Sequence, residues 1–266
     1  MPLISDMVAA VEALIPPSLG ADWDNTGLQA GDPSAKAGAV MVALDATPEA
    51  VDEAAGAGAG LLVTHHPLFF RDIKSLDFSY GQGAAVMLAS LCGVAIYSAH
   101  TSFDRVSPGV SDALAGAIGL RAIRPLEKMR GTPGAGFGRI GNLPRKMKAS
   151  DFAGLVKKAL GADCVRIAGD PGKTVRRVAV CGGSGSDLIP LAAVSGADAF
   201  VTGDVKYHDA LFARGMGLVL MDAGHYYTER CALPLLADTV AKAFKKKGIK
   251  AKVIISRTQG EPWAGI

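Results

Sequence analysis

The chain has few cysteines and lacks the patterns of a secretion signal and of a membrane-spanning segment. Residues 1–6 show no basic stretch followed by an apolar core, and no apolar run approaches the roughly 20 residues that a helix needs to cross a bilayer. The cysteines stand singly, without the spacing of a zinc site or the density of a disulfide scaffold; they are Cys92, Cys164, Cys181 and Cys231. We therefore expect a cytoplasmic protein with no membrane partner, whose cysteines are small core residues.

The sequence also lacks a strong excess of charge of one sign. The formal net charge is +3, so charge alone gives no reason to expect a nucleic-acid partner. Two basic clusters occur, at residues 145–148 and 245–247. The second falls at the expected end of a helix, where cations interact favourably with the helix dipole, so we interpret the clusters as solvated surface.

The composition is that of a compact globular protein. Of the 266 residues, 49% are hydrophobic and 20% are charged, and 33 are glycine, which is typical of an enzyme-like chain and not of a disordered one. A chain of this length can bury a sizeable core, either as one large α/β domain or as two smaller ones.

The first half predicts alternating strands and helices. Ala39 to Leu44 is an apolar strand, Thr47 is an N-cap candidate before a helix that runs to about Ala57, and 61–64 is a second strand. This is a βαβ unit, so its strands should be parallel. Further helices are expected at 5–15, 84–91 and 109–119, and further strands at 94–97 and 218–221.

Three connecting segments carry expectations of their own. The polar, turn-rich stretch around Trp23 is typical of a loop that is pinned by burying an indole. Residues 67–83 lack periodicity and should form a long surface loop. The Gly- and Pro-rich stretch from about Arg121 to Pro144 is the best candidate for a connection between domains.

The second half repeats the first. A shift of 138 residues sets Val178 over Val40 and the Val-Thr pair at 201–202 over the pair at 63–64 without a gap. The same order of strand, turn, helix, glycine and strand recurs, which is better explained by duplication than by chance. We therefore predict two similar α/β domains, the first made of residues 1–122 and 230–266 and the second of 123–229.

Two adjacent histidines, His65 and His66, follow the strand at 61–64. Open α/β sheets bind ligands at the carboxyl ends of their strands, and neutral imidazole is the commonest metal ligand. The chain has five histidines in all, so a pair at one strand end suggests a metal site. The alternative is that one histidine caps the strand and the other is a hydrogen-bonded, half-buried polar residue.

Other strand ends add to this pair. The polar residues that follow predicted strands form a set of imidazoles and carboxylates: His65, His66, His100, Asp104, His225 and Glu229. His100 and Asp104 are four residues apart, as are His225 and Glu229, and on a helical turn this spacing puts both side chains on one face. The set exceeds what one tetrahedral ion needs, so two ions bridged by a carboxylate fit better, and they would lie between the domains if the two halves face each other. Zn, Fe, Mn, Co and Ni all suit these donors.

A glycine-rich turn and a further histidine are weaker candidates for substrate binding. Gly183, Ser184 and Gly185 follow a strand and precede a helix, so their amides could hold an anion, although a tight structural turn explains them as well. His208 could contact a substrate, or it could be an exposed histidine at the start of a helix.

Together these motifs resemble those of the NIF3-like dinuclear metal-centre family, the GTP cyclohydrolase I type 2 homologues. The motifs are Trp23-Asp24-Asn25-Thr26-Gly27-Leu28, Thr64-His65-His66-Pro67, Ser98-Ala99-His100-Thr101-Ser102-Phe103-Asp104, Cys181-Gly182-Gly183-Ser184-Gly185, Thr202-Gly203-Asp204 and Gly224-His225-Tyr226-Tyr227-Thr228-Glu229. The resemblance implies a two-domain protein, often a toroidal hexamer, with a two-metal site at the domain cleft. The chain is too short to contain the extra domain that some members insert between the halves.

The resemblance also implies roles for individual residues. The ligands would be His65, His66, Asp104, His225 and Glu229, with Glu229 as the bridge. His100 would either orient a ligand or transfer a proton. The implied function is metal-dependent hydrolysis of a nucleotide-like or phosphate-containing small molecule, and the alternative is a non-enzymatic metal carrier or metallocofactor-assembly protein.

Overall fold

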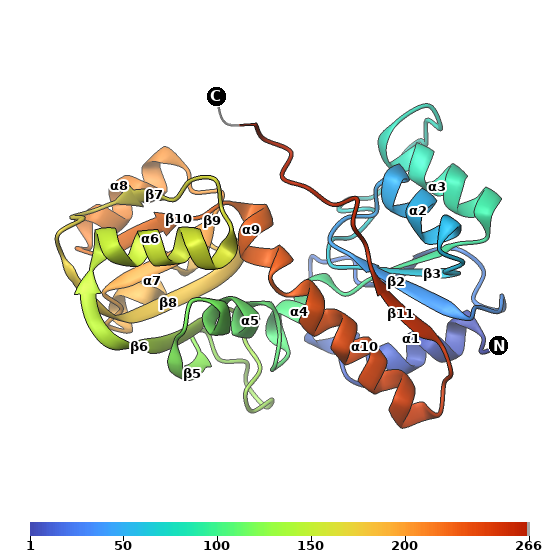
Figure 1. Cartoon of the computed structure of the whole chain (residues 1–266), viewed down its shortest axis with the longest axis horizontal. Coiled ribbons are helices and arrows are strands. Elements are labelled where there is room, and N and C mark those ends of the chain that lie inside the picture. The colour runs from blue at the N-terminus through green and yellow to red at the C-terminus, as the bar shows by residue number, and fades with distance from the viewer. Residues whose placement is uncertain (265–266) are drawn as a thin grey trace. The chain divides into compact units, whose positions relative to one another are not determined.

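A computed structural model describes residues 1–264 and divides the chain into two units (Figure 1). Unit 1 comprises Met1–Phe103 and Leu233–Gly260, and unit 2 comprises Asp104–Ala232 with the residues from Glu261 onward. The chain thus first leaves unit 1 after Phe103, whereas the sequence suggested residue 122.

Unit 1 is built on a five-stranded sheet in the order β1-β4-β3-β2-β11. Its strands are β1 (Gly27–Ala30), β2 (Ala39–Ala43), β3 (Leu61–Thr64), β4 (Ala95–Ser98) and β11 (Lys252–Ile255). All neighbours are parallel except β1, which pairs antiparallel with β4. The predicted parallel βαβ unit at residues 39–64 is confirmed.

Helices cover both faces of this sheet (Figure 1). They are α1 (Ile4–Glu12), α2 (Pro48–Gly56), α3 (Gly81–Cys92) and α10 (Leu233–Lys247), with a short 3₁₀ turn at Pro17–Leu19. Met41 and Leu62 point toward α2 and α3 and join one core with Val51. Alternate strand residues such as Val40 and Val42 are buried on the other face, where α1 and α10 pack together. Burial on both faces explains why these strands read as continuous apolar runs.

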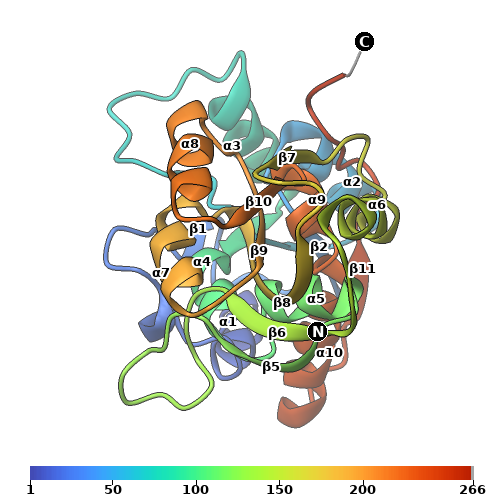
Figure 2. The same ribbon diagram turned by 90° about the vertical axis from the view of Figure 1, so that its left-hand side faces the viewer.

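Unit 2 has a six-stranded sheet in the order β5-β6-β8-β9-β10-β7 (Figure 2). Its strands are β5 (Arg121–Pro125), β6 (Arg139–Lys148), β7 (Arg166–Ala168), β8 (Thr174–Ser184), β9 (Ala199–Gly203) and β10 (Val219–Asp222). The stretch 121–144, expected as a domain connection, instead supplies β5 and most of β6. The Gly and Pro content misled that interpretation because β5 is an edge strand and the pairing of β6 with both of its neighbours contains register shifts, and both features tolerate such residues.

The helices of unit 2 also form two layers. They are α5 (Val110–Ala117) and α6 (Ala149–Leu160) on one face, with α7 (Ile189–Val194) and α8 (Tyr207–Gly215) on the other (Figure 2). Val178 and Val180 pack with α5 and α6, whereas Ala179 and Cys181 pack with α7 and α8. A 3₁₀ turn at Ser186–Leu188 leads into α7.

Strand register confirms the internal duplication. Val40 pairs with Leu61 between β2 and β3, and Val178 pairs with Ala199 between β8 and β9. The same shift of 138 residues converts the first pair into the second. Each sheet also has one antiparallel edge strand beside its parallel strands, β1 on β4 in unit 1 and β7 on β10 in unit 2. The predicted class, two similar α/β domains, is confirmed.

The two repeats exchange their last elements. The first repeat ends in the short helix α4 (His100–Arg105) and the second in α9 (His225–Arg230). Helix α5, which follows α4, packs on β6 and β8 of unit 2, whereas α10 and β11, which follow α9, complete unit 1. The division therefore falls at α4 and just after α9, not at the glycine-rich stretch.

Several local expectations can be compared with the structure. The hydroxyl of Thr47 accepts a hydrogen bond from the Ala50 amide at 3.2 Å, as predicted for an N-cap. The indole of Trp23 was expected to be buried but is 70% exposed. Cys92 and Cys164 were expected in the core but are exposed. In the described part of the chain, every helix is too short or too polar to span a bilayer.

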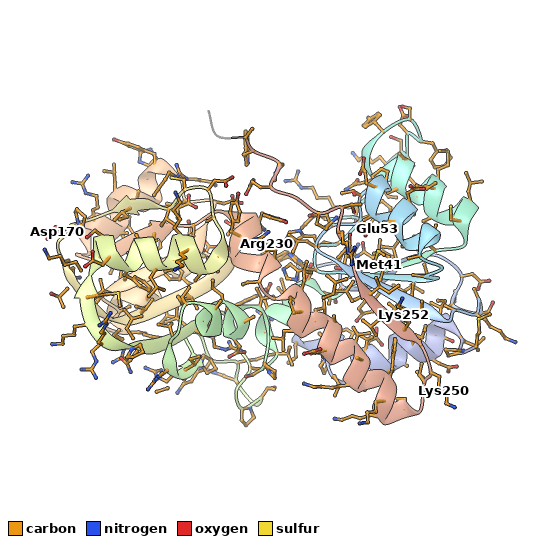
Figure 3. The ribbon with its side chains drawn as sticks, viewed as in Figure 1. Met41, Glu53, Asp170, Arg230, Lys250 and Lys252 are labelled. Carbon is orange, nitrogen blue, oxygen red and sulfur yellow. The ribbon has the colours of Figure 1, made fainter. Side chains whose placement is uncertain are left out.

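Glu53 of α2 anchors the segment that follows β11 (Figure 3). Its carboxylate accepts hydrogen bonds from the amides of Arg257, at 2.9 Å, and Thr258 and from the hydroxyl of Ser256. Burial raises the pKa of Glu53, but these hydrogen bonds outweigh it and hold the pKa below its usual value. The anchor fixes the chain where it leaves edge strand β11.

A buried arginine holds the edge of unit 2 together. Arg139 is 1% exposed and makes a bidentate ion pair with Asp112, at 2.7 and 2.8 Å. Its remaining N–H groups donate to the carbonyls of Val106, Gly136 and Gly138. Because every donor group of the guanidinium has an acceptor, β6 is tied to α5 and to the loop before it.

Arg139→Met should destabilise the protein by about 3 kcal/mol or more, because it leaves the Asp112 carboxylate without its cation in a poorly solvated site. Urea unfolding followed by circular dichroism measures this. The control is Arg176→Met on neighbouring β8, where the side chain is exposed and the change should stay within about 0.5 kcal/mol. Equal effects of the two variants would contradict a structural role for the buried pair.

Candidate metal centre

The strand ladder of unit 1 brings three histidines to one edge of the sheet. Beyond β3, the amide of His65 donates to Ala43 at 3.1 Å and the amide of His66 donates to Leu44 at 2.8 Å. The amide of His100, at the start of α4, donates to the carbonyl of His65 at 2.8 Å. Parallel pairing therefore continues past the strands and fixes the backbone of all three residues.

The three imidazoles form a compact cluster. One ring nitrogen of each of His65, His66 and His100 lies within 4.8 Å of the others. The ring centroids of His65 are 4.9 Å from those of His66 and 5.4 Å from those of His100. His65 is 2% exposed, and such a set of side chains could hold a metal ion.

Carboxylates orient two of these rings. Nδ1 of His66 lies 2.8 Å from Oδ1 of Asp45, and Nδ1 of His100 lies 2.7 Å from Oδ1 of Asp24. A carboxylate at Nδ1 keeps the proton on that nitrogen, so Nε2 is the nitrogen that can bind a metal or accept a proton. This arrangement of acid and imidazole is typical of metal sites.

Asp24 is itself held firmly. Its side chain is 1% exposed, and its second oxygen accepts hydrogen bonds from the amide of Thr101, at 3.0 Å, and from the Thr101 hydroxyl. Burial raises the pKa of Asp24, but the hydrogen bonds from His100 and Thr101 outweigh it and leave the pKa below its usual value. The acid therefore stays ionised beside His100.

Unit 2 contains a matching pair of side chains on α9. Nε2 of His225 lies 3.1 Å from Oε2 of Glu229, four residues later, as the spacing predicted. Nδ1 of His225 lies 2.7 Å from Oδ2 of Asp204. The Glu229 side chain is 6% exposed, so this pair repeats the pattern of a carboxylate-oriented imidazole beside a buried acid.

Gly183 forms the wall against which this pair packs. A Cβ atom at Gly183 would lie 2.1 Å from Oε1 of Glu229 and 3.1 Å from Nε2 of His225, and its backbone has φ +63°. Its amide donates to Thr228 at 3.0 Å, and the amide of Gly185 donates to Thr202 at 2.9 Å. These two amides therefore have protein acceptors, and the turn packs closely against Glu229, which favours the tight structural turn over the anion site that the sequence also allowed.

Asp104 and Glu229 both lie near the thiol of Cys181. Burial first, and then the charges of these two acids, raise the pKa of Cys181. Burial and the charge of Glu229 likewise raise the pKa of Cys231 to about 12. These cysteines are therefore thiols at neutral pH, and the donors here are carboxylates and imidazoles.

The structure brings together most of the predicted residues within each unit. His65, His66 and His100 gather in unit 1, and His225 and Glu229 gather in unit 2, with Asp104 near Cys181. His208 is exposed at the start of α8, with its ring against Tyr207, 5.3 Å between centroids.

Three carboxylates were not predicted as site residues. Asp24 stands in a motif that carried the family resemblance, but nothing near it in sequence points to His100. Asp45 closely follows β2, so the rule that found the histidines, polar residues after strand ends, could have found it. Asp204 also stands in a motif that carried the family resemblance, at the position that His66 has in the first repeat, but the sequence assigned it no role.

Comparison with known proteins now decides the family. The chain matches the model of Duf34/NIF3 (NGG1p interacting factor 3) over residues 2–262. It belongs to the Duf34/NIF3 family. A GTP cyclohydrolase 1 type 2 homolog of Streptomyces coelicolor is 38% identical over 268 residues, covering 99% of this chain and 94% of the relative. A protein of the same name from Clostridium acetobutylicum is 31% identical, covering 98% and 97%.

Solved structures agree with this assignment. The crystal structure of a Bacillus cereus protein related to NIF3 superimposes with a TM-score of 0.95 at 24% identity, covering 100% of this chain and 99% of the other. The Staphylococcus aureus protein SA1388 gives a TM-score of 0.94 at 29% identity, covering 99% of each chain. The family resemblance read from the sequence is confirmed.

The donor set fits a divalent transition metal. Imidazoles with oriented Nε2 atoms and a buried carboxylate suit Zn, Fe, Mn, Co or Ni, and the thiols nearby remain protonated. Glycine at position 183 also leaves space for the Glu229 carboxylate, which the Cβ of any other residue at that position would occupy.

Gly183→Ala should displace Glu229 and His225 and lower metal retention by about tenfold or more, because a Cβ cannot share the space of Oε1. Elemental analysis after dialysis against limiting metal measures this. Gly154→Ala on the exposed face of α6 is the control, since its Cβ would meet nothing within 4 Å, and it should leave metal content unchanged. Normal metal content in Gly183→Ala would show that metal binding does not depend on the close packing of Gly183 against Glu229.

Proposed function

We propose that the protein is a dinuclear divalent-metal protein that hydrolyses a nucleotide-like or phosphate-containing small molecule. One observation carries the proposal: in each unit a carboxylate pairs with Nδ1 of a histidine and leaves Nε2 as the nitrogen that can bind a metal ion. The pairs are Asp45 with His66 and Asp204 with His225. The names of the relatives, GTP cyclohydrolase 1 type 2 homologs, are consistent with a nucleotide-like substrate.

In this proposal each unit supplies part of the ligand set. Unit 1 would supply His65 and His66, and unit 2 would supply Asp104, His225 and Glu229, with the Glu229 carboxylate shared by both ions. When bound, two divalent ions supply an acidified water and a Lewis acid for a carbonyl or phosphoryl oxygen.

The chain's own contribution is proton transfer by His100. Asp24 holds Nδ1–H of His100, which leaves Nε2 as the basic nitrogen and steadies the imidazolium after it takes a proton. The rings of Trp23 and Phe70 stand edge-on to His100, at centroid distances of 6.0 and 5.5 Å, and limit the access of bulk water to it. His100 also lies close enough to His65 and His66 to share their ion, and the His100 variant below separates the two roles.

A metal carrier or metallocofactor-assembly protein would use the same ligands. What favours the hydrolase is the Asp24–His100 pair, because handing over an ion needs no oriented base. The family resemblance further leads us to propose a homo-oligomer, a hexamer, which light scattering would detect; a monomer at micromolar concentration would contradict it.

The metal-loaded protein should contain about two divalent ions per chain, in keeping with a two-metal site. Glu229→Ala should reduce this number, because the shared acid is lost. His208→Ala is the matched control, being an exposed histidine of the same unit, and should retain the full content. Inductively coupled plasma spectrometry gives the stoichiometry, and one ion or fewer per chain, unchanged in Glu229→Ala, would overturn the two-metal proposal.

His100→Ala should lower kcat by about 100-fold or more in any hydrolysis found by screening nucleotides and phosphate esters, because the oriented base is lost. Its metal content should stay near that of the parent protein. Loss of metal in parallel with activity would make His100 a ligand instead. Metal-loaded protein that hydrolyses nothing, yet delivers its ion to an acceptor chelator faster than free exchange, would favour the carrier.

A further inference from the structure

Unit 1 contains a cavity of about 580 Å³, and one of its lining residues, Phe69, follows His66 by three residues. Its walls are edge strand β1 with the turn after it, helix α3, and the loop that follows β3; the principal lining residues are Gln29, Asp32, Phe69, Ile73, Leu76 and Ser90. The volume lies within the range of roughly 300–1,000 Å³ that is typical of small-molecule sites.

The floor of the cavity is made of small residues that the backbone requires. Gly31 has φ +109°, and a Cβ there would lie 2.5 Å from Cα of Ala95 on β4. Gly93, which ends α3 in the left-handed conformation, and Ala95 complete the floor. The hollow therefore follows from the close approach of Gly31 to β4 just beyond the antiparallel pairing of β1 with β4, and a larger side chain at Gly31 could not close it.

Its walls are mostly apolar and are not fully covered. Phe69 packs against the core of unit 1, whereas Ile73 and Leu76 at the mouth are 46% and 36% exposed. An apolar occupant would remove this surface from water, which contributes about 25 cal/mol for each Å².

The charge at the rim limits what can bind. Of the described residues that line the cavity, Asp32 is the one with a charged side chain. The hydroxyl and amide of Ser34 donate to its Oδ1, at 2.7 and 2.8 Å, and hold the pKa of Asp32 below its usual value. A neutral or cationic molecule is therefore favoured over an anion.

The loop wall connects the cavity to the histidines. The amide of Phe69 donates to Oε1 of Gln29 at 3.1 Å, and its carbonyl accepts from Nδ2 of Asn25 at 2.9 Å. The next residue, Phe70, places its ring edge-on to His100, at 5.5 Å between centroids, and against His66 at 6.1 Å. A shift of Phe69 would therefore be felt at both histidines.

We propose that this cavity binds a neutral or cationic small molecule with an apolar body and a hydrogen-bond-donating group, and that its occupancy is transmitted to the histidine cluster through Phe69 and Phe70. The enclosure by strand, helix and loop and the floor of small residues fit a compact molecule better than an extended protein segment. The proposal goes beyond the hydrolase assignment and holds whether or not the site binds metal.

Two probes that share one ring system test the binding. N-phenyl-1-naphthylamine is neutral and has one N–H donor, whereas 1-anilinonaphthalene-8-sulfonate adds a negative charge. Fluorescence titration should show saturable binding of the first probe at one molecule per chain and weaker binding of the second, by about twofold or more, because the exposed carboxylate of Asp32 repels the sulfonate. Asp32→Asn should bring the affinities of the two probes closer together, because the negative charge is removed.

Neighbouring residues of α3 provide the matched variants. Ser90→Phe fills the cavity from an exposed lining position, and Leu91→Phe adds the same ring one residue later, at a side chain that is 76% exposed and does not line the cavity. Ser90→Phe should weaken binding of the neutral probe by about tenfold or more and Leu91→Phe by less than about twofold. Equal binding to both variants, or titrations that do not saturate, would overturn the site.

Trp23 reports on the second half of the proposal, since its indole lies 6.0 Å from the His100 ring. In a Trp263→Phe background Trp23 is the remaining tryptophan. Saturating neutral probe should change the Trp23 emission, and Phe70→Ala should abolish that change while leaving probe affinity within about twofold. A response that survives in Phe70→Ala, or an unchanged Trp23 signal in the parent, would refute transmission but not binding.

Discussion

Parallel pairing of strands in register is the constraint on which the candidate site depends. In unit 1 the ladder from β2 to β4 continues into Leu44, His66 and the start of α4, so polar residues that are far apart in the chain share one sheet edge. Unit 2 repeats the arrangement, with Thr202 opposite Asp222 and α9 beginning two residues beyond β10, after Ala223 and Gly224. A slip of one residue would turn His65 to the opposite face, and register is specified because both faces are buried.

The exchange of terminal elements protects this arrangement. Each repeat ends in a six-residue helix that begins at a histidine, too short to be stable by itself. Because the next helix, α5 or α10, packs on the other repeat's sheet, α4 and α9 are held at both ends by different cores. The side chains of His100 and His225 thus start from anchored backbone.

Sequence reasoning succeeded where the signal is local. The pair at His65 and His66 and the four-residue spacing from His225 to Glu229 reflect strand ends and helical turns, which nearby residues determine. It did not find Asp24, because its partner His100 lies 76 residues away, and only folding joins them. Trp23 was expected in the interior on the strength of its size, but its indole is exposed and stands edge-on to the His100 ring. The segment 121–144 was misread because an edge strand, β5, and the irregular pairing of β6 tolerate the Gly and Pro residues that also mark linkers.

The difference between the repeats at β3 and β9 has a physical explanation. Gly203 stands where the first repeat has His65, and a Cβ there would lie 2.6 Å from the amide nitrogen of His225. The start of α9 therefore occupies the space that a side chain after β9 would need. Asp204, at the position of His66, adopts φ +54° and turns its carboxylate to Nδ1 of His225. The second repeat therefore uses this position differently. The first repeat has His66, a candidate metal ligand, whereas the second has Asp204, whose carboxylate orients His225 of α9.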